Sequence, residues 1–297
     1  MSLWIFATFF AASVQAFRFL LQKRLALGGL SPVAATFARF VWAPPVLFLG
    51  LALWAATGHP IPAPPPGFWL PAVAGAISQI LATICVVALF AHRNFAVGIA
   101  FSKTTVLMTV LTGFLILGET VTWFALAAMV VGFAGVVLLS VPLGGTGWQV
   151  FNRASGLGLA AGAFFSVSAV GYRAASLGVP SDEPLLRAAI TLGWVTLIQT
   201  GILAAWLGWR DRAGLVAVFT EWRATTLVGA TSLAGSLAWF TAYTLQTAAL
   251  VNAVGQVELI LSMLISWLIL GERTTRRELM GIALLGASVV GLVILTA

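Results

Sequence analysis

The sequence Leu-Ile-Leu-Gly-Glu occurs twice in the chain, at residues 115–119 and again at residues 268–272. The copies are 153 residues apart, and the same shift aligns Thr122 with Thr275, Leu126 with Leu279, Val136-Val137 with Val289-Val290, and Trp69 with Trp222. A shift of 155 residues aligns Phe9-Phe10, Ser13 and Arg18 with Phe164-Phe165, Ser168 and Arg173. Apolar segments resemble one another by composition alone, but shared charged motifs indicate a true repeat. We therefore predict two related halves, residues 1–143 and 154–297.

Both halves are strongly apolar. Of 297 residues, 61% are hydrophobic, and only 23 (15 Lys and Arg with 8 Asp and Glu), or 8%, are charged. A soluble domain carries about 25% charged residues, because these residues face the surrounding water. The composition therefore excludes a soluble enzyme with one large core, and its high apolar content excludes a disordered chain. It is typical of an all-α polytopic membrane protein.

Ten apolar stretches are long enough to cross a bilayer, since about 20 apolar residues span about 30 Å of hydrocarbon. They run approximately over residues 3–22, 32–56, 68–91, 95–117, 122–141, 155–176, 186–208, 224–246, 249–270 and 278–296. Each half then holds five spans, an odd number, so the second half enters the membrane from the opposite side. Two inverted five-helix repeats around a central cavity are typical of transporters that open alternately to either face.

The basic residues predict the orientation of the chain. Thirteen fall on the side of the odd-numbered connections: Arg18, Lys23, Arg24, Arg39, Arg93, Lys103, Arg153, Arg210, Arg212, Arg223, Arg273, Arg276 and Arg277. Only Arg173 and Arg187 fall on the other side. Because Lys and Arg accumulate in cytoplasmic loops, we expect both termini to lie outside the cell (inner) membrane. The orientation accounts for the net charge of +7, so the charge does not indicate a nucleic-acid partner. No basic run with interleaved aromatic residues lies outside the predicted spans.

The two halves, each with Leu-Gly-Glu at the end of its fourth span, resemble the EamA-type branch of the drug/metabolite transporter superfamily. In that family the fourth and ninth spans often read Pro-Val-Phe…Leu-Gly-Glu. Here Val106 and Leu259 stand in place of the prolines, and Glu258 matches an acidic residue that often precedes the proline. The resemblance implies a ten-helix basket whose cavity is lined by the first four helices of each half. It also implies export of small metabolites, as by the YddG-type amino-acid exporters; many members have both termini in the cytoplasm, contrary to the charge-based orientation.

Two ionisable residues lie deep in the predicted spans. Glu258 is near the middle of the ninth span, and Lys103 is in the matching region of the fourth. Charged groups inside a membrane are costly and by default face a protein interior or an aqueous cavity. Since these spans approach the pseudo-two-fold axis from opposite faces, the two side chains can meet near the midplane. The pair either lines a cavity that binds an amino acid, with Glu258 able to exchange a proton, or forms a structural ion pair between the halves.

Further polar and aromatic residues on neighbouring spans could complete a pocket: Gln15, Gln79, Ser102, Trp239, Tyr243 and Gln256. Binding sites are mostly apolar with a few converging polar groups, which this set matches. The alternative is that the Gln and Ser side chains join helices by hydrogen bonds, while Trp and Tyr lie at the lipid headgroups. Arg18 and Arg173, at corresponding span ends, are expected to extend to the membrane surface. Glu119 and Glu272 are expected to cap helices or face solvent.

The sequence thus predicts an alternating-access transporter that exports small metabolites, with amino acids as the preferred substrate class. Alternatives on the same scaffold are a lipid or lipid-linked sugar flippase and a drug or nucleoside exporter. An intramembrane enzyme is disfavoured, because the two histidines, His59 and His92, lie in or beside loops and cannot complete a protease site. No metal, cofactor or nucleotide-binding loop is expected. Small residues four apart, as at Gly158 and Gly162, indicate packing within one chain, so we predict a monomer whose partners are its substrate and membrane lipid.

Overall fold

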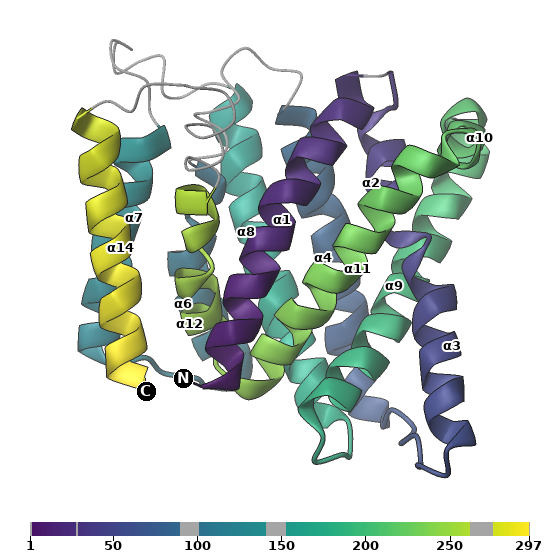
Figure 1. The fold of residues 1–297 in the computed structure, drawn as a ribbon, viewed down its shortest axis with the longest axis horizontal. Helices are drawn as coiled ribbons and strands as arrows, with labels where there is room; N and C mark the ends of the chain where they lie inside the picture. The colour runs from purple at the N-terminus through teal and green to yellow at the C-terminus, as the bar shows by residue number, and fades with distance from the viewer. Residues whose placement is uncertain (1, 28, 90–100, 141–152, 262–275, 297) are drawn as a thin grey trace.

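Apolar stretches of this length form helices, because a backbone that crosses lipid must pair its own N–H and C=O groups. The computed structural model describes residues 2–27, 29–89, 101–140, 153–261 and 276–296. Within these ranges the helices lie side by side in a bundle (Figure 1). They are α1 (Leu3–Leu27), α2 (Pro32–Phe40), α3 (Ala43–Ala56), α4 (Pro66–Leu89), α6 (Thr105–Leu117), α7 (Trp123–Ser140), α8 (Arg153–Gly178), α9 (Pro184–Arg210), α10 (Arg212–Thr220), α11 (Trp222–Leu245), α12 (Ala248–Val254) and α14 (Arg276–Thr296).

Several of these segments are suited to crossing a membrane. Four in the described part are long and apolar enough by length and composition: Pro32–Ala56, taken across the bend between α2 and α3, Pro66–Leu89, Arg153–Gly178 and Pro184–Arg210. Shorter apolar helices, among them α6 and α7, complete the bundle. The second predicted span is broken between α2 and α3, and α10 forms in a stretch predicted to be a connection. The protein is an all-α polytopic membrane protein.

The two halves are inverted relative to each other. Helix α1 begins at the end of the bundle where both termini lie, whereas α8 begins at the opposite end (Figure 1). The first helix of each half packs against the third helix of the other, α1 against α11 and α4 against α8. The fifth helices, α7 and α14, pack against each other. Exchanging the halves therefore exchanges equivalent contacts, as expected for two repeats related by a pseudo-two-fold axis.

The fourth and ninth spans are interrupted at matching positions. Before α6, the Val106 N–H donates to the Lys103 carbonyl at 3.3 Å, and after α12, the Leu259 N–H donates to the Gln256 carbonyl at 3.0 Å. Both bonds join residues three apart, as in a 3₁₀ turn, and they replace the wider α-helical pattern. Val106 and Leu259 stand where the EamA-type pattern has proline, so these helices break without it. The local 3₁₀ bonds keep the freed backbone groups satisfied inside the bundle.

Glycines let helices of opposite halves approach closely. A Cβ on Gly171 of α8 would lie 2.8 Å from the Pro71 carbonyl oxygen and 3.2 Å from the Gly75 Cα of α4. A Cβ on Gly135 of α7 would lie 2.8 Å from the Gly281 carbonyl oxygen of α14. In lipid, helices associate through close packing rather than the hydrophobic effect, so small residues mark their contacts. These contacts join the first half of the chain to the second.

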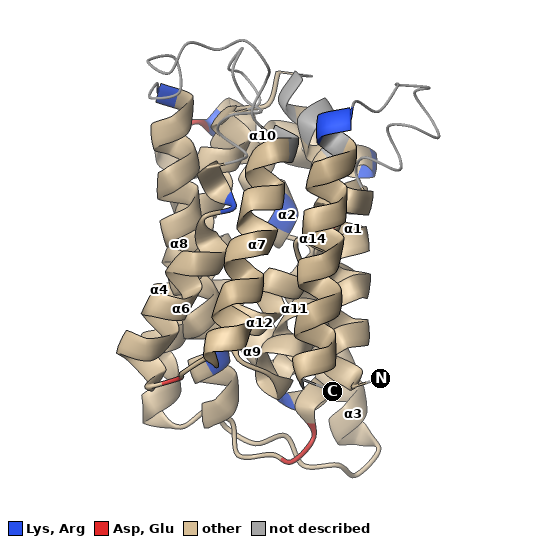
Figure 2. Ribbon diagram, turned by 90° about the vertical axis from the view of Figure 1, so that its left-hand side faces the viewer, with Lys and Arg blue, Asp and Glu red and all other residues tan. Residues whose placement is uncertain are grey.

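The two ends of the bundle differ in charge (Figure 2). Six arginines in the described ranges lie in or beside helix ends away from the termini: Arg153, Arg210, Arg212, Arg223, Arg276 and Arg277. We call this end the basic end. The end with the termini holds the acidic Asp182 and Glu183 just before α9, together with Arg173 and Arg187.

Three basic residues counted on the side of the odd-numbered connections are buried inside the bundle: Arg18, Arg39 and Lys103. Arg18 is 3% exposed, because α1 continues well past the predicted end of the first span. The prediction that Arg18 extends to the membrane surface is therefore wrong. Arg39 is 4% exposed and lies within α2, inside the second predicted span, so its charge is not a loop charge. Arg93 and Arg273 lie outside the described residues.

Candidate functional site

A cavity of about 310 Å³ lies between the two halves. Its walls come from α1, α2, α4, α6, α8, α11 and α12 and from the two helix interruptions. The eight residues that the sequence nominated all line it: Gln15, Gln79, Ser102, Lys103, Trp239, Tyr243, Gln256 and Glu258. Residues from seven separate stretches of sequence thus converge on one chamber, because the inverted repeat brings equivalent helices to a common axis.

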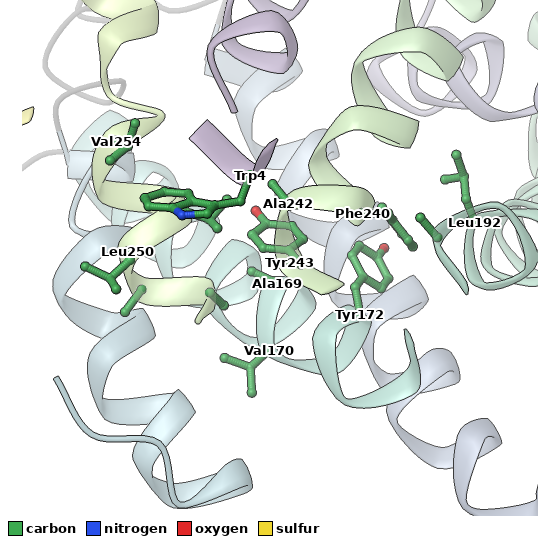
Figure 3. Close-up of a cluster of buried hydrophobic side chains, with 14 of the residues drawn as sticks. Trp4, Ala169, Val170, Tyr172, Leu192, Phe240, Ala242, Tyr243, Leu250 and Val254 are labelled. Atoms are coloured by element: carbon green, nitrogen blue, oxygen red, sulfur yellow. The ribbon is translucent and has the colours of Figure 1, made fainter. Parts of the chain in front are cut away.

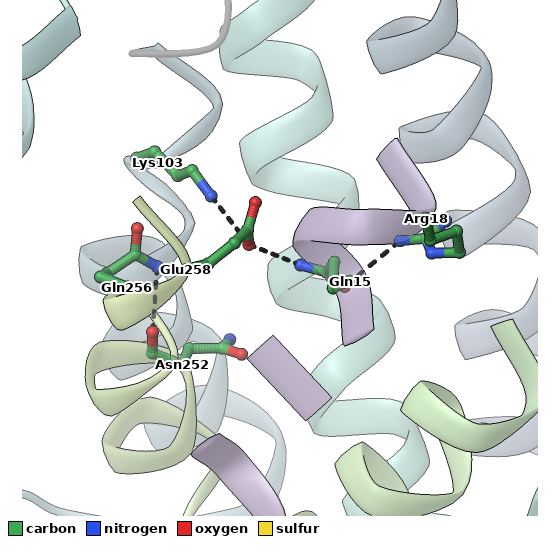
Figure 4. A network of polar contacts seen from close by, with 6 residues as sticks. All are labelled: Gln15, Arg18, Lys103, Asn252, Gln256 and Glu258. Atoms are coloured by element: carbon green, nitrogen blue, oxygen red, sulfur yellow. Dashed lines mark hydrogen bonds and ion pairs between the residues drawn. The ribbon is translucent and has the colours of Figure 1, made fainter. Parts of the chain in front are cut away.

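Lys103 and Glu258 meet at the two helix interruptions. The Lys103 Nζ lies 3.3 Å from the Glu258 Oε2, and both side chains are buried. The Gln15 Nε2, from α1, donates to the same Oε2 at 2.7 Å. The Glu258 carboxylate is therefore held by one cation and one amide, as Figure 4 shows. Each interruption turns the chain so that its charged side chain points toward the partner repeat.

The polar contacts continue from Gln15 to a second cation. The Arg18 Nη2 donates to the Gln15 Oε1 at 3.3 Å, and the Arg18 Nη1 donates to the Gln22 Oε1 at 2.8 Å. Arg18 lies beyond Gln15 as seen from Lys103 (Figure 4). Lys103 thus contacts the Glu258 carboxylate directly, while the Gln15 amide links the same carboxylate to Arg18.

Arg39 is a third buried cation, and it comes from another part of the bundle. It lies one residue before the end of α2 and lines the cavity. Its Nε donates to the Ser232 Oγ of α11 at 3.1 Å, and its Nη1 donates to the Thr83 Oγ1 of α4 at 2.8 Å. Both partners are neutral hydroxyl groups. Among the described residues, no carboxylate forms an ion pair with Arg39.

Aromatic side chains form one wall of the cavity. The rings of Trp239 and Tyr243 stack with centroids 5.8 Å apart, and those of Tyr172 and Phe240 stack at 4.3 Å. Tyr172, Phe240 and Tyr243 also belong to the hydrophobic core, which includes Trp4 (Figure 3). The alternative that Trp239 and Tyr243 lie at the lipid headgroups is therefore wrong.

Hydrogen bonds orient this wall. The Tyr243 hydroxyl donates to the Asn252 Oδ1 at 2.7 Å, and the Asn252 Nδ2 donates to the Thr109 Oγ1 at 2.9 Å. The Gln199 Nε2 donates to the Tyr172 hydroxyl at 3.1 Å. Buried phenol groups usually need such a partner, because an unpaired polar group in a low-dielectric interior is costly.

Three polar atoms around the cavity have no hydrogen-bond partner among the described residues: Gln256 Oε1, Thr105 Oγ1 and Trp239 Nε1. All three atoms are buried, and their residues line the chamber. Unpaired buried polar groups are uncommon in folded proteins and call for an explanation. The wall of the chamber therefore contains donors and acceptors whose hydrogen-bonding capacity the described residues leave unused.

The sequence failed to identify Arg39 and Asn252 as cavity residues. Arg39 was counted among the positive charges that orient the chain, although it stands seven residues inside an apolar stretch. Asn252 is one of few polar residues in the ninth predicted span. In both cases the available signal was a polar residue within a span, which by default faces a cavity or a partner.

A further ion pair joins the halves toward the end with the termini. The Arg173 Nε of α8 pairs with the Glu119 Oε1, which follows α6. The Arg173 Nη1 also donates to the carbonyls of Tyr243 at 2.6 Å and Gln246 at 2.7 Å, at the end of α11. Arg173 thus satisfies carbonyls that a helix end leaves open. It does not extend to the surface as predicted, and Glu119 pairs instead of capping; Glu272 lies outside the described residues.

Comparison with known proteins agrees with this architecture. The EamA-like transporter family matches residues 2–141 and again residues 153–294. A solved crystal structure of another protein has the same fold, with a TM-score of 0.71 and 18% sequence identity over 97% of this chain and 96% of that chain. Comparison with curated proteins gives no match. The family match covers both inverted halves, so the chain belongs to the EamA-like transporter family of the drug/metabolite transporter superfamily, whose members are transporters and not enzymes.

Proposed function

We propose that this transporter exports amino acids across the cell (inner) membrane by alternating access. The observation that carries the proposal is the buried Lys103–Glu258 pair, 3.3 Å apart, at the cavity edge where the interrupted helices of the two repeats meet. An ammonium group and a carboxylate side by side suit the opposite charges of an α-amino acid. The orientation with both termini outside, inferred from the basic end, is part of the proposal.

The size and chemistry of the chamber support a small polar solute. Binding pockets for small molecules typically measure about 300–1,000 Å³ and are mostly apolar with a few polar groups. At about 310 Å³, this chamber lies at the small end of that range. Its aromatic wall and its open polar atoms match the rest of the description. The residues that line the chamber all belong to one chain, so a single copy can form it.

The alternative is that Lys103 and Glu258 only fasten the halves together. A buried ion pair rarely stabilises a protein more than apolar residues of similar volume would, so stability alone gives little reason for the pair. Its place beside the chamber and at the helix interruptions favours a role in transport. Discontinuous helices at the interface of inverted repeats hold the substrate site in many secondary transporters.

Counterflow of labelled amino acids into proteoliposomes tests the proposal. We expect Glu258→Gln to lower the rate about tenfold or more, since it removes a charge-assisted contact with the solute's ammonium group. Glu221→Gln, at an exposed acidic residue of the basic end, is the matched control and should leave the rate unchanged.

A charge-swapped double variant, Lys103→Glu with Glu258→Lys, separates the two roles. If the pair only fastens the halves, the swap should restore both thermal stability and transport relative to the single variants. If the pair contacts the solute, stability should recover while transport does not. Movement of a nucleoside or a labelled lipid with no amino acid would show that the substrate class is wrong.

A further inference from the structure

The chamber carries an excess of positive charge. Arg39 and Lys103 line it, and Arg18 lies directly behind Gln15. Among the described lining residues, Glu258 is the only carboxylate. Arg18 interacts electrostatically with both Arg39 and Glu258, so the guanidinium groups share one neighbourhood. Counted over these described residues alone, Arg18, Arg39 and Lys103 against Glu258 leave a net charge of +2 in an interior where unpaired charge is costly.

Arg39 is a lining cation with which no described carboxylate forms an ion pair. Lys103 pairs with Glu258, and Arg18 donates to two amide oxygens. Arg39 donates to two hydroxyl groups, while a guanidinium group has five N–H donors in a planar fork. That fork matches the geometry of a carboxylate better than that of any neutral acceptor. Among the described residues, its surroundings hold no anion of the kind that a buried arginine ordinarily requires.

Arg39 and the Lys103–Glu258 pair are held by different elements. Arg39 projects from α2 and is fixed by Thr83 of α4 and Ser232 of α11. The pair stands on the two helix interruptions. Arg39 and the Lys103–Glu258 pair thus form two charged sites that line the same cavity of about 310 Å³. The site at Lys103 and Glu258 has both signs of charge, and the site at Arg39 is purely cationic.

We propose that the preferred solute is an acidic amino acid, an amino dicarboxylate whose side-chain carboxylate binds Arg39. Its α-ammonium group would lie against Glu258 and its α-carboxylate against Lys103. This proposal rests on the proposed function, and it specifies a solute whose net charge is −1. A second carboxylate offsets part of the chamber's excess positive charge, which a neutral amino acid leaves uncompensated.

Glutamate and glutamine form a test pair, because they have nearly the same size and differ in one charge. Counterflow of each labelled amino acid is measured with the wild-type protein in proteoliposomes, and aspartate and asparagine serve as a second pair. We expect the wild-type protein to favour the acidic member by about ten- to hundredfold, the range that one charge-assisted hydrogen bond supplies. This comparison needs no variant and so does not depend on a variant's folding.

Arg39→Gln should bring the ratio of the two rates close to one, and Arg39→Lys should retain part of the preference, since it keeps the charge but not the fork. Arg223→Gln, at an exposed arginine of the basic end, is the control and should keep the wild-type ratio. Equal transport of both members by the wild-type protein, or a ratio insensitive to Arg39, would overturn the assignment while leaving amino-acid transport intact. Failure of every amino acid to move would overturn the proposed function itself.

Discussion

At the scale of single residues, the position of a charge along its helix decides what the charge does. Arg39 is buried beside the chamber, whereas Asp211 stands at the basic end between α9 and α10. Asp211 caps α10 by accepting the Gly214 N–H at 2.8 Å, and it accepts the Ser31 hydroxyl at 2.7 Å. Ser31 in turn caps α2 by accepting the Ala34 N–H. One carboxylate therefore ties together two helix beginnings from opposite halves.

These contacts make the Asp211 cap dependent on pH. The hydrogen bond from Ser31, followed by that from Gly214, lowers the pKa of Asp211 below its usual value of 3.8. A lowered folded-state pKa means that the stabilisation is complete above the unfolded-state pKa and is lost as the pH falls through the folded-state value. We expect Asp211→Ala to cost about 0.5–2 kcal/mol at neutral pH, as for other caps.

Thermal unfolding in detergent between pH 3 and pH 7 would measure this effect. The gap in Tm between the wild-type protein and Asp211→Ala should stay constant above about pH 5 and narrow toward pH 3. Asp211→Asn keeps an acceptor without the charge and should show a smaller gap with little pH dependence. A gap that is constant over the whole range would contradict the role of the carboxylate.

At the scale of helices, the contact between α4 and α8 depends on two glycines. Gly75 and Gly171 bring the backbones so close that a Cβ on Gly171 would lie 2.8 Å from the Pro71 carbonyl oxygen. Backbone atoms cannot move aside as a flexible side chain can. Since α4 belongs to the first half and α8 to the second, this contact sets the distance between the repeats.

We expect Gly171→Ala to destabilise the protein by about 1–3 kcal/mol, the usual cost of overpacking a close contact. Gly156→Ala in the same helix is the matched control, because a Cβ there meets nothing within 4 Å. Alanine is the better helix former, so the control should be neutral or stabilising by up to about 1 kcal/mol. Thermal unfolding of both variants makes the comparison, and equal stability would show that the two helices can separate without cost.

At the scale of the whole molecule, the inverted repeat gives the bundle a pseudo-two-fold axis, while the charges distinguish its two ends. The described arginines at helix ends lie mostly at the basic end, and both termini lie at the other. The ion pair of Arg173 with Glu119 joins the halves toward the end with the termini. Alternating access requires such contacts at one end to separate when the chamber opens there.

Labelling of single cysteines tests the orientation. Cys85 is the only native cysteine, so Cys85→Ser provides the background. We expect a membrane-impermeant maleimide to label Ser2→Cys in intact cells, and Thr220→Cys at the basic end only after the membrane is opened, because positive residues favour the cytoplasmic side. The reverse pattern would place the termini in the cytoplasm, as in many members of the family.

The sequence alone determined the class of the protein and its division into two inverted halves, and it predicted that Lys103 and Glu258 can meet. These features follow from composition, from the number of spans in each half and from the cost of placing charge in lipid. The recurrence of Leu-Ile-Leu-Gly-Glu identified the equivalent spans, which an inverted repeat places around one axis.

Only the tertiary structure decided the places of Arg18, Arg39 and Arg173. Arg18 and Arg173 stand close to predicted span ends, and Arg39 stands seven residues inside a predicted span. At such positions a cation serves equally well in a loop, at the lipid headgroups or in the protein interior. The choice depends on how far each helix continues and on which partner it packs against, such as the α11 carbonyls that bind Arg173. The α11 carbonyls lie 70 and 73 residues from Arg173 along the chain, and Ser232 lies 193 residues from Arg39. No local pattern can reveal partners at these separations, whereas Gln15 and Gln22, which bind Arg18, are only three and four residues away.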